Sequence, residues 1–248
     1  MKITKQPYKK PASLTDTVFS YCPGCSHGTV HKIIAEIIDE LNMREKTVCV
    51  APVGCAVFAY DFFNFDVTEA AHGRASAVAT AMKRVLPDRL VFAYQGDGDL
   101  ASIGMAETIH TASRGENVTV IFINNTNYGM TGGQLSPTTL INQKTTTSQE
   151  GRDLKNYGYP IRVPELLQPM HGVKYLARVK VTDAAAVLAA KRAIRKGFSN
   201  QLANVGYSMI EVLSSCPANW KMEPLEANKF VDTAVADYYK IGVIKDVS

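Results

Sequence analysis

The sequence predicts an α/β fold with a doubly wound, mainly parallel sheet and helices on both faces. Short, β-rich apolar runs alternate with amphipathic helical patterns along the chain, as in sheets built from right-handed crossovers. Each apolar run has the length of a strand buried on both faces. A polar or reactive cluster directly follows four of these runs, and ligands of doubly wound sheets bind outside the carboxyl ends of the strands.

The elements are predicted in the following order. Apolar residues recur at helical spacing from about 30 to 41, just past a Cys-x-x-Cys pair. Strands are expected at 47–53, 90–95, 118–124 and 207–215, and further helices at about 73–85, 100–113 and 184–198. The weakly patterned stretch 126–169 is longer than ordinary connections and is expected to be a functional loop region.

Length and composition indicate one folded domain over residues 1–248. With 46% hydrophobic and 20% charged residues, the chain has ordinary globular composition and is long enough to bury a core. We expect an N-terminal tail at 1–17 and a C-terminal helical tail at about 225–248.

The charge pattern argues against nucleic acid and membrane partners. The net charge is +4, without a long basic run, which is typical of a solvated surface. One basic cluster at helical spacing is expected to be an exposed face, with a phosphate-bearing substrate or an acidic partner as the alternative: Lys191, Arg192, Arg195 and Lys196. The apolar run at 48–60 is too short for a bilayer and the N-terminus has no signal-peptide core, which predicts a soluble, cytoplasmic protein.

The cysteines raise three possibilities. Cys22 and Cys25 lie in YCPGCSHG and could be a redox dithiol, half of a zinc site or half of an iron-sulfur site. Cys55 and Cys216 follow predicted strands, which a dithiol alone leaves unexplained, whereas Cys49 lies inside a strand and is expected to pack. Zinc would need two more ligands, which His27 or His31 could also supply, so spacing alone leaves zinc and iron-sulfur level.

A second pattern combines GDGD at 96–99 with Asn-Asn at 124–125. Glycines on either side of Asp97 let the backbone approach a diphosphate, and the following helix offers its N-terminal end. Asn125 comes 28 residues after Asp97, the length of one helix plus one strand, so a βαβ unit returns it to the neighbouring strand end. The two oxygen ligands could share Mg²⁺. Since short Gly/Asp strings are mostly turns, the spacing to Asn125 is what favours a site.

This pair resembles the thiamine diphosphate motif. The resemblance implies that Mg²⁺ is bound by the side chains of Asp97 and Asn125 and by the backbone carbonyl of Asn127. It also implies which residues border the cofactor: Val53, Gly54, Cys55, Ala56, Gly96, Asp97, Gly98, Asn125, Gly129 and Met130.

The ordered set of YCPGCSHG, VGC, HGRA, GDGD with NN, and SSCP resembles the thiamine diphosphate-binding β subunit of 2-oxoacid:ferredoxin oxidoreductases, over about residues 18–217. The resemblance implies a 4Fe-4S cluster on Cys22, Cys25, Cys55 and Cys216. His72 and Arg74 resemble the family's HGR segment and are expected as catalytic residues near the cofactor or the substrate carboxylate; the alternative is a helix-entry turn with a surface arginine.

The family resemblance also implies a function and partners. The expected reaction is the thiamine-dependent oxidative decarboxylation of a 2-oxoacid to acyl-CoA and carbon dioxide, with electrons passed through the cluster to ferredoxin. An α subunit would supply the aminopyrimidine side of the thiamine site, so this chain is predicted to be half of an active site. Further expected partners are γ and ferredoxin-like δ subunits and coenzyme A.

Substrate choice depends on the apolar segment after Cys55. Val57, Phe58 and Phe62 could form a pocket for branched chains or could be ordinary core. The interpretation favours 2-oxoisovalerate, with 2-oxoglutarate as the alternative. An alternative of another class is a zinc-stabilised scaffold or sensor that binds a diphosphate without catalysis.

Overall fold

The computed structural model describes residues 9–248, which form a seven-stranded sheet in the order β2-β1-β3-β4-β6-β5-β7. Six strands pair in parallel, and β7 pairs with β5 in the antiparallel sense. The predicted α/β class with a mainly parallel sheet is confirmed. The strands are β1 Thr47–Ala51, β2 Asp66–Glu69, β3 Leu90–Gly96, β4 Thr119–Asn124, β5 Val173–Lys180, β6 Tyr207–Leu213 and β7 Gly242–Asp246.

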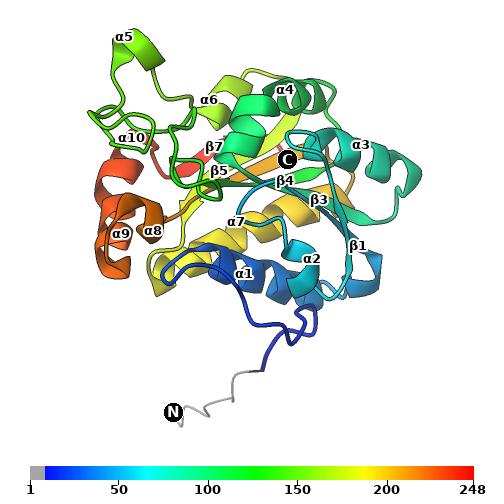
Figure 1. The fold of residues 1–248 in the computed structure, drawn as a ribbon. Coiled ribbons are helices and arrows are strands. Elements are labelled where there is room, and N and C mark those ends of the chain that lie inside the picture. The colour runs from blue at the N-terminus through cyan, green and yellow to red at the C-terminus, as the bar shows by residue number, and fades with distance from the viewer. Residues whose placement is uncertain (1–8) are drawn as a thin grey trace, which may run out of the picture.

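Helices cover both faces of the sheet (Figure 1). The long helices α1 and α7 pack against each other on one face, and α3, α4 and α6 lie on the other. The helices are α1 His27–Glu40, α2 Ala59–Phe62, α3 Ala75–Val85, α4 Met105–Ser113, α5 Leu154–Tyr157, α6 Val163–Leu167, α7 Ala184–Leu202, α8 Pro217–Trp220, α9 Pro224–Phe230 and α10 Ala236–Tyr238. A 3-10 turn, η1 Arg44–Lys46, and two π-helical turns, η2 Asp99–Ile103 and η3 Val231–Val235, complete the described chain.

The strands bury alternate residues on opposite faces. In β3, Phe92 and Tyr94 pack into the core beneath α1 and α7, whereas Val91 and Ala93 pack beneath α3 and α4. Because both faces are covered, each central strand is a continuous apolar run rather than an alternating one. This explains why the four runs seen in the sequence correspond to β1, β3, β4 and β6.

Three strands of the described chain do not correspond to any predicted strand: β2, β5 and β7. In β5 the apolar pattern is broken by Arg178, which is nevertheless fully buried because it pairs with Glu211 of β6 and with Glu165. The predicted helical tail at 225–248 is wrong at its end, since its last residues add β7 to the sheet edge. The predicted helix at 100–113 begins as the π-helical turn η2.

The tail and the basic cluster also differ from expectation. Of the predicted tail at 1–17, residues 1–8 lie outside the described residues, and Leu14 bridges to Phe63 beside α2. Of the four basic side chains of α7, Arg192 is exposed as expected, whereas the other three pair with acids of α1 and β7: Lys191 with Glu36 and Glu40, Arg195 with Glu40, and Lys196 with Asp246.

The topology places a crevice between β1 and β3. From β1 the chain moves outward to β2 and then returns to β3 on the other side of β1, so the strand order reverses at this point. Ligands of open α/β sheets bind at the carboxyl ends of the strands where such a reversal occurs. Within residues 9–248 no helix has the length and apolar character needed to cross a membrane.

Candidate functional site

A cavity of about 180 Å³ opens at the carboxyl ends of β1, β3 and β4. It brings together, on three strand-end loops, all the residues expected to border the cofactor: Val53, Gly54, Cys55, Ala56, Gly96, Asp97, Gly98, Asn125, Gly129 and Met130. His72 and Asn127 also line it, together with His27, Pro52, Asp99, Ile123, Tyr128 and Thr131. The residues predicted from the sequence to border the cofactor therefore line one cavity.

Asp97 is the buried acid of this cavity, and its carboxylate is already oriented. Oδ2 accepts hydrogen bonds from Ser136 Oγ at 2.8 Å and Thr138 Oγ1 at 2.6 Å, and Oδ1 accepts from the Gly98 amide at 2.8 Å. Burial nevertheless raises the pKa of Asp97 to about 6. A carboxylate that is oriented yet costly to ionise is what a bound cation would stabilise.

Two further features fit a magnesium diphosphate group. A methyl group built on Gly96 or Gly54 would meet no atom within 4 Å, so the backbone at both strand ends faces open space. Asn127 is buried, and its side-chain oxygen Oδ1 has no hydrogen-bond partner among the described residues. Buried polar atoms are ordinarily paired, so an unpaired oxygen beside Asp97 suits a cation or its water shell.

His72 enters the cavity from the loop before α3 and is held by Asp99. Its Nδ1 lies 2.6 Å from Asp99 Oδ1, which also accepts the Gly73 amide at 2.8 Å and the Val53 amide at 3.3 Å. Gln95 Nε2 donates to the other oxygen, Oδ2, at 2.7 Å. Asp99 thus ties the loops after β1 and β2 to the end of β3.

Arg74 does not reach the cavity. Its guanidinium forms an ion pair with Glu107 of α4 and donates to the Ile103 carbonyl at 3.4 Å. The structure places this residue in the alternative role considered for it, a partly exposed arginine at a helix entry. The prediction that Arg74 is a catalytic residue beside His72 is not supported by its position.

The four cysteines predicted to bind the cluster lie on three segments near the cavity: Cys55 lines it, and Asn219 links Cys216 to Gly129 of its lining. Burial raises the pKa of Cys25 to about 11 and that of Cys55 to about 12. Cys22 and Cys216 raise both values further, so all four thiols lie within electrostatic range of one another. Cys49 is buried inside β1 and packs in the core, as expected.

Hydrogen bonds join the Cys-x-x-Cys loop to the end of β6. Ser215 Oγ donates to the Gly24 carbonyl at 2.7 Å, and the Ser26 and Ser215 hydroxyls lie 3.2 Å apart. Asn219 Nδ2 then donates both to Cys216 Sγ at 3.3 Å and to the Gly129 carbonyl at 2.8 Å. Asn219 therefore links Cys216 to the loop that carries Gly129.

The four thiols do not converge on a site for a single metal ion. Within residues 9–248, no three side chains of His, Cys, Asp and Glu stand close enough to hold a single ion. A tetrahedral zinc site needs all its sulfurs about 2.3 Å from one centre. In a 4Fe-4S cluster each cysteine binds a different iron, which suits thiols that are near one another without converging.

Several residues of the site were not singled out from the sequence. Ser136 and Thr138 orient Asp97 from the long loop, and Asn219 supports Cys216. His27 was considered as a zinc ligand, but its Nδ1 lies 2.7 Å from Tyr94 OH, and burial lowers its pKa to about 4, so it is neutral. Asp99 could have been found from the sequence, because it is the second aspartate of GDGD.

The aromatic segment after Cys55 does not form the expected pocket. Phe62 is buried in the core, with ring centroids 5.0 Å from Phe19 and 5.5 Å from Tyr21. Phe58 is exposed, and neither it nor Val57 lines the cavity. Of the two alternatives considered for this segment, ordinary core fits Phe62, because the short helix α2 turns it inward.

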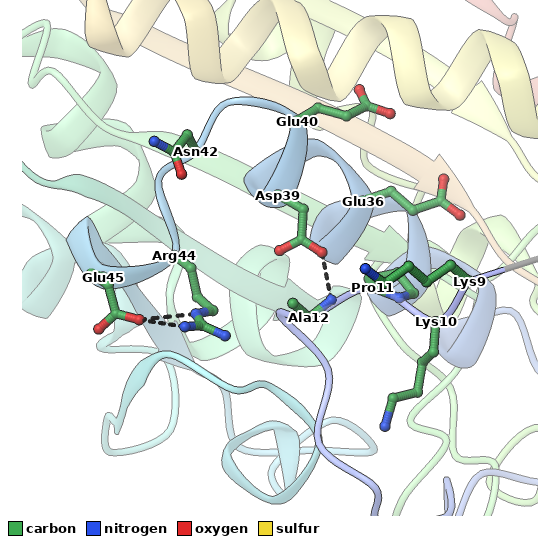
Figure 2. Close-up of a pocket in the computed structure, with 10 residues that line it drawn as sticks. All are labelled: Lys9, Lys10, Pro11, Ala12, Glu36, Asp39, Glu40, Asn42, Arg44 and Glu45. Carbon is green, nitrogen blue, oxygen red and sulfur yellow. Dashed lines mark hydrogen bonds and ion pairs between the residues drawn. The ribbon is translucent and has the colours of Figure 1, made fainter.

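A larger hollow of about 570 Å³ lies elsewhere, between the N-terminal segment and the far end of α1 (Figure 2). Charged side chains of both signs line it, including Lys9, Lys10, Glu36 and Arg44, and the Ala12 amide donates to Asp39 at its edge. This end of α1 is about 20 Å from the cysteine loop at its start. The hollow contains none of the residues that carry the chemistry.

Comparison with known proteins agrees with the site. Residues 53–212 match the family described as thiamine pyrophosphate enzyme, C-terminal TPP binding domain. The chain is 43% identical to ketoisovalerate oxidoreductase subunit VorA of Methanothermobacter thermautotrophicus over 99% of its own length and 54% of the relative. It is 34% identical to 2-oxoglutarate synthase subunit KorB of Archaeoglobus fulgidus, covering 84% of this chain and 74% of the relative.

The fold has a solved counterpart. A structure titled 2-oxoglutarate:ferredoxin oxidoreductase from Magnetococcus marinus, with 2-oxoglutarate, coenzyme A and succinyl-CoA bound, superposes with a TM-score of 0.78. It shares 22% sequence identity and covers 99% of this chain and 87% of that one, which supports the fold. The chain spans about half the length of the VorA relatives that it matches.

Proposed function

This chain belongs to the family of thiamine diphosphate-binding subunits of 2-oxoacid:ferredoxin oxidoreductases, and from that premise we propose that it contributes the diphosphate and electron-acceptor half of such an active site. The reaction is the oxidative decarboxylation of a 2-oxoacid to acyl-CoA and carbon dioxide. The observation that carries the proposal is the single cavity in which Cys55 lies beside Asp97 and Asn125.

Asp97, Asn125 and the Asn127 carbonyl would hold Mg²⁺ on the diphosphate. Thiamine supplies a carbon nucleophile and stores the electrons left when carbon dioxide departs. The chain's own contribution would be positional: the open backbone at Gly96 and Gly54 would leave room for the phosphates, and Ser136 and Thr138 fix the orientation of the Asp97 carboxylate. Since these groups need no rearrangement, the diphosphate would bind a preorganised site.

Cys22, Cys25, Cys55 and Cys216 would hold the 4Fe-4S cluster, which accepts electrons one at a time. Cys55 belongs to both groups, because a methyl group on Gly129 of the cofactor loop would sit 2.9 Å from its sulfur. Such close packing would keep thiamine diphosphate and the cluster adjacent. Cys22 is exposed, so the electrons would leave toward ferredoxin on that side.

An α subunit would complete the site. The described cavity of about 180 Å³ contains the diphosphate-side residues, with Met130 exposed at its rim. The carboxylate that activates the aminopyrimidine ring is assigned to the partner. The γ and δ subunits, ferredoxin and coenzyme A would bind elsewhere in the assembled complex and not in this cavity.

For the substrate we favour a branched-chain 2-oxoacid. The support is the 43% identity to a ketoisovalerate oxidoreductase subunit over nearly the whole chain, against 32–36% for 2-oxoglutarate synthase subunits. The aromatic side chains after Cys55 no longer contribute to this choice. An apolar partner residue in the assembled site would supply the remaining selectivity.

The test is anaerobic purification of the chain with its native partners, followed by metal analysis and an assay of dye reduction that depends on a 2-oxoacid and coenzyme A. We expect a brown complex with about four irons for each copy of this chain and faster turnover of 2-oxoisovalerate than of 2-oxoglutarate. Zinc in place of iron, without activity on any 2-oxoacid, would overturn the proposal in favour of a zinc-stabilised scaffold.

A further inference from the structure

Asp99 lies two residues after Asp97, the proposed magnesium ligand, but its own carboxylate is surrounded by hydrogen-bond donors. It is 2% exposed and faces four donors: the Val53 and Gly73 amides, Gln95 Nε2 and the His72 ring. The two amides and the Gln95 side-chain nitrogen can only donate to it, so both carboxyl oxygens act as acceptors in this arrangement. A carboxylate that only accepts requires the His72 nitrogen facing it, Nδ1, to carry a proton.

The surrounding backbone holds this pair rigidly. Asp99 begins the π-helical turn η2, a form often found at functional sites. A methyl group on Gly73 would lie 2.7 Å from the Gly104 nitrogen, and one on Gly104 would lie 2.4 Å from the Asp99 carbonyl. Only glycines allow this approach of the His72 loop to the turn. The distance from carboxylate to ring is therefore set by backbone contact at both ends.

The other ring nitrogen of His72 is left available. Nε2 has no hydrogen-bond partner within residues 9–248, although His72 lines the cavity. In His27, the other cavity histidine, Nδ1 lies against Tyr94 OH and the ring stacks on Tyr21 at 4.9 Å, so no carboxylate orients it. His72 is the cavity histidine whose free nitrogen is both oriented and open.

We propose that Asp99 is a positioning residue that keeps His72 protonated at Nδ1, so that Nε2 exchanges a proton with the keto oxygen of the bound 2-oxoacid. The substrate class rests on the proposed function; the tautomer does not. In the step, the carbon nucleophile that thiamine would supply would bond to the keto carbon, and the C=O π pair would move to the oxygen. That oxygen would take the proton of imidazolium Nε2, which leaves the ring in the neutral Nδ1–H form that Asp99 orients. Carboxylate-to-imidazole pairs commonly orient a proton-transferring histidine in this way.

The direct test is nitrogen NMR of the full chain labelled with ¹⁵N-histidine, at a pH where the imidazoles are neutral. We expect the His72 signal, assigned by its loss in His72→Gln, to report the Nδ1–H tautomer. In Asp99→Asn the signal should shift toward the Nε2–H form, because an amide can present a donor to Nδ1. The exposed control Asp88→Asn should leave it unchanged. A wild-type Nε2–H tautomer would overturn the proposal whatever the substrate.

Kinetics of the assembled complex distinguish a positioning role of Asp99 from a merely structural one. His72→Gln should lower kcat by about 10²-fold or more, the usual contribution of a proton-transferring group, with thiamine and iron contents retained. Asp99→Asn should lower kcat similarly, and the double variant should be little worse than either, since the two residues act as one unit. Multiplicative losses in the double variant would contradict the proposal. The exposed His110→Gln serves as the histidine control.

Failure of the proposed function would look different. If no 2-oxoacid is turned over by the wild-type complex, the substrate assignment fails while the tautomer result still decides the role of Asp99. If the complex is active but His72→Gln keeps full kcat, proton exchange by His72 is overturned and the proposed function stands.

Discussion

The site has two sides that are built differently. The oxygen side surrounds Asp97 and Asn125, and the sulfur side contains Cys22, Cys25, Cys55 and Cys216. On the oxygen side, Asp97 is buried and held by two hydroxyls, and the segment that supplies them is pinned from behind. The buried Arg152 guanidinium donates to the Ser136 and Thr139 carbonyls at 3.0 and 3.1 Å, and Tyr239 OH donates to the Thr138 carbonyl at 2.7 Å. This side is organised by the chain itself.

The sulfur side depends more on what it holds. Its four thiols come from three loops, Cys22 is exposed, and a hydrogen bond to sulfur is seen at Cys216, from Asn219. The elevated pKa values of Cys25 and Cys55 mean that these thiols are protonated at neutral pH without a metal. Metal ligation must displace those protons, so binding there is coupled to deprotonation and local ordering.

This difference predicts that thiamine diphosphate and the iron-sulfur cluster can be lost independently of each other. A preformed oxygen site can lose its ligand without collapsing, and a thiol site can lose its cluster while the sheet holds the diphosphate end in place. We therefore expect single substitutions to remove one cofactor and spare the other.

The largest effects are expected from Asp97→Ala and Cys216→Ser. Asp97→Ala removes the carboxylate proposed to bind magnesium and should abolish thiamine retention while iron content stays near that of the wild type. Cys216→Ser should remove most of the iron and leave thiamine bound, since Cys216 lies outside the cavity lining. Both should abolish dye reduction. Thiamine and iron are measured on the same anaerobic preparations.

Cys49 provides the matched control for the cysteine change. It is equally a free thiol, but it is buried inside β1 in the apolar core. Cys49→Ala should therefore keep the full iron content. Joint loss of thiamine and iron in Asp97→Ala would show that the two sides form one cooperative unit and would contradict the comparison.

The next largest effect is expected on folding stability, from the buried ion pairs of Arg178 with Glu211 and Glu165. Arg178 Nε donates to Glu211 at 2.6 Å, and the other oxygen of Glu211 accepts from Asn124, which precedes Asn125. Arg178→Met leaves a buried carboxylate without its cation and should cost about 3–5 kcal/mol of unfolding free energy. Urea denaturation measures this. The partly exposed Lys180, paired with Asp232, is the control; Lys180→Met should cost under about 1 kcal/mol.

The same network explains how far the sequence predicts the fold. The strands β1, β3, β4 and β6 were predicted because apolar runs show burial on both faces. The strand β5 was missed because its burial includes Arg178, and the acids that neutralise that charge lie 13 and 33 residues away in the chain. Tertiary pairing of this kind leaves no periodic signal. The edge strand β7 is short and partly exposed, and gives no apolar run.

For the site, residues adjacent to strand ends were predictable and their supports were not. Topology alone brings Gly54, Asp97 and Asn125 to one edge of the sheet, so their cavity followed from order along the chain. Thr138 lies 41 residues beyond Asp97 in an irregular loop, where no pattern announces which hydroxyl turns inward. Arg74 was expected beside His72, but its side chain pairs with Glu107 of α4, a long-range contact that its motif does not reveal.

A smaller effect, dependent on pH, is expected in the chain without magnesium and thiamine. Burial raises the pKa of Asp97 from 3.8 to about 6, so the folded state binds this proton more tightly than the unfolded state. The resulting stability is fully present below about pH 4 and is lost as pH rises through 6. Asp97→Asn should thus be more stable than the wild type at pH 8, on the order of 3 kcal/mol, and equal to it near pH 4. A pH-independent difference in the urea midpoint would contradict this.

The smallest effects should come from the hydroxyls that orient Asp97. Ser136→Ala and Thr138→Val each remove one hydrogen bond to Oδ2 and should weaken magnesium-dependent thiamine binding about tenfold, as supporting residues of metal ligands usually do. Iron content should not change, because neither hydroxyl touches a cysteine ligand. Isothermal titration with thiamine diphosphate at fixed Mg²⁺ measures the affinity, with the exposed Thr146→Val as control from the same loop. Unchanged affinity in both variants would mean that the loop does not preorganise the oxygen side, and that its order is imposed by the bound cofactor, as proposed for the sulfur side.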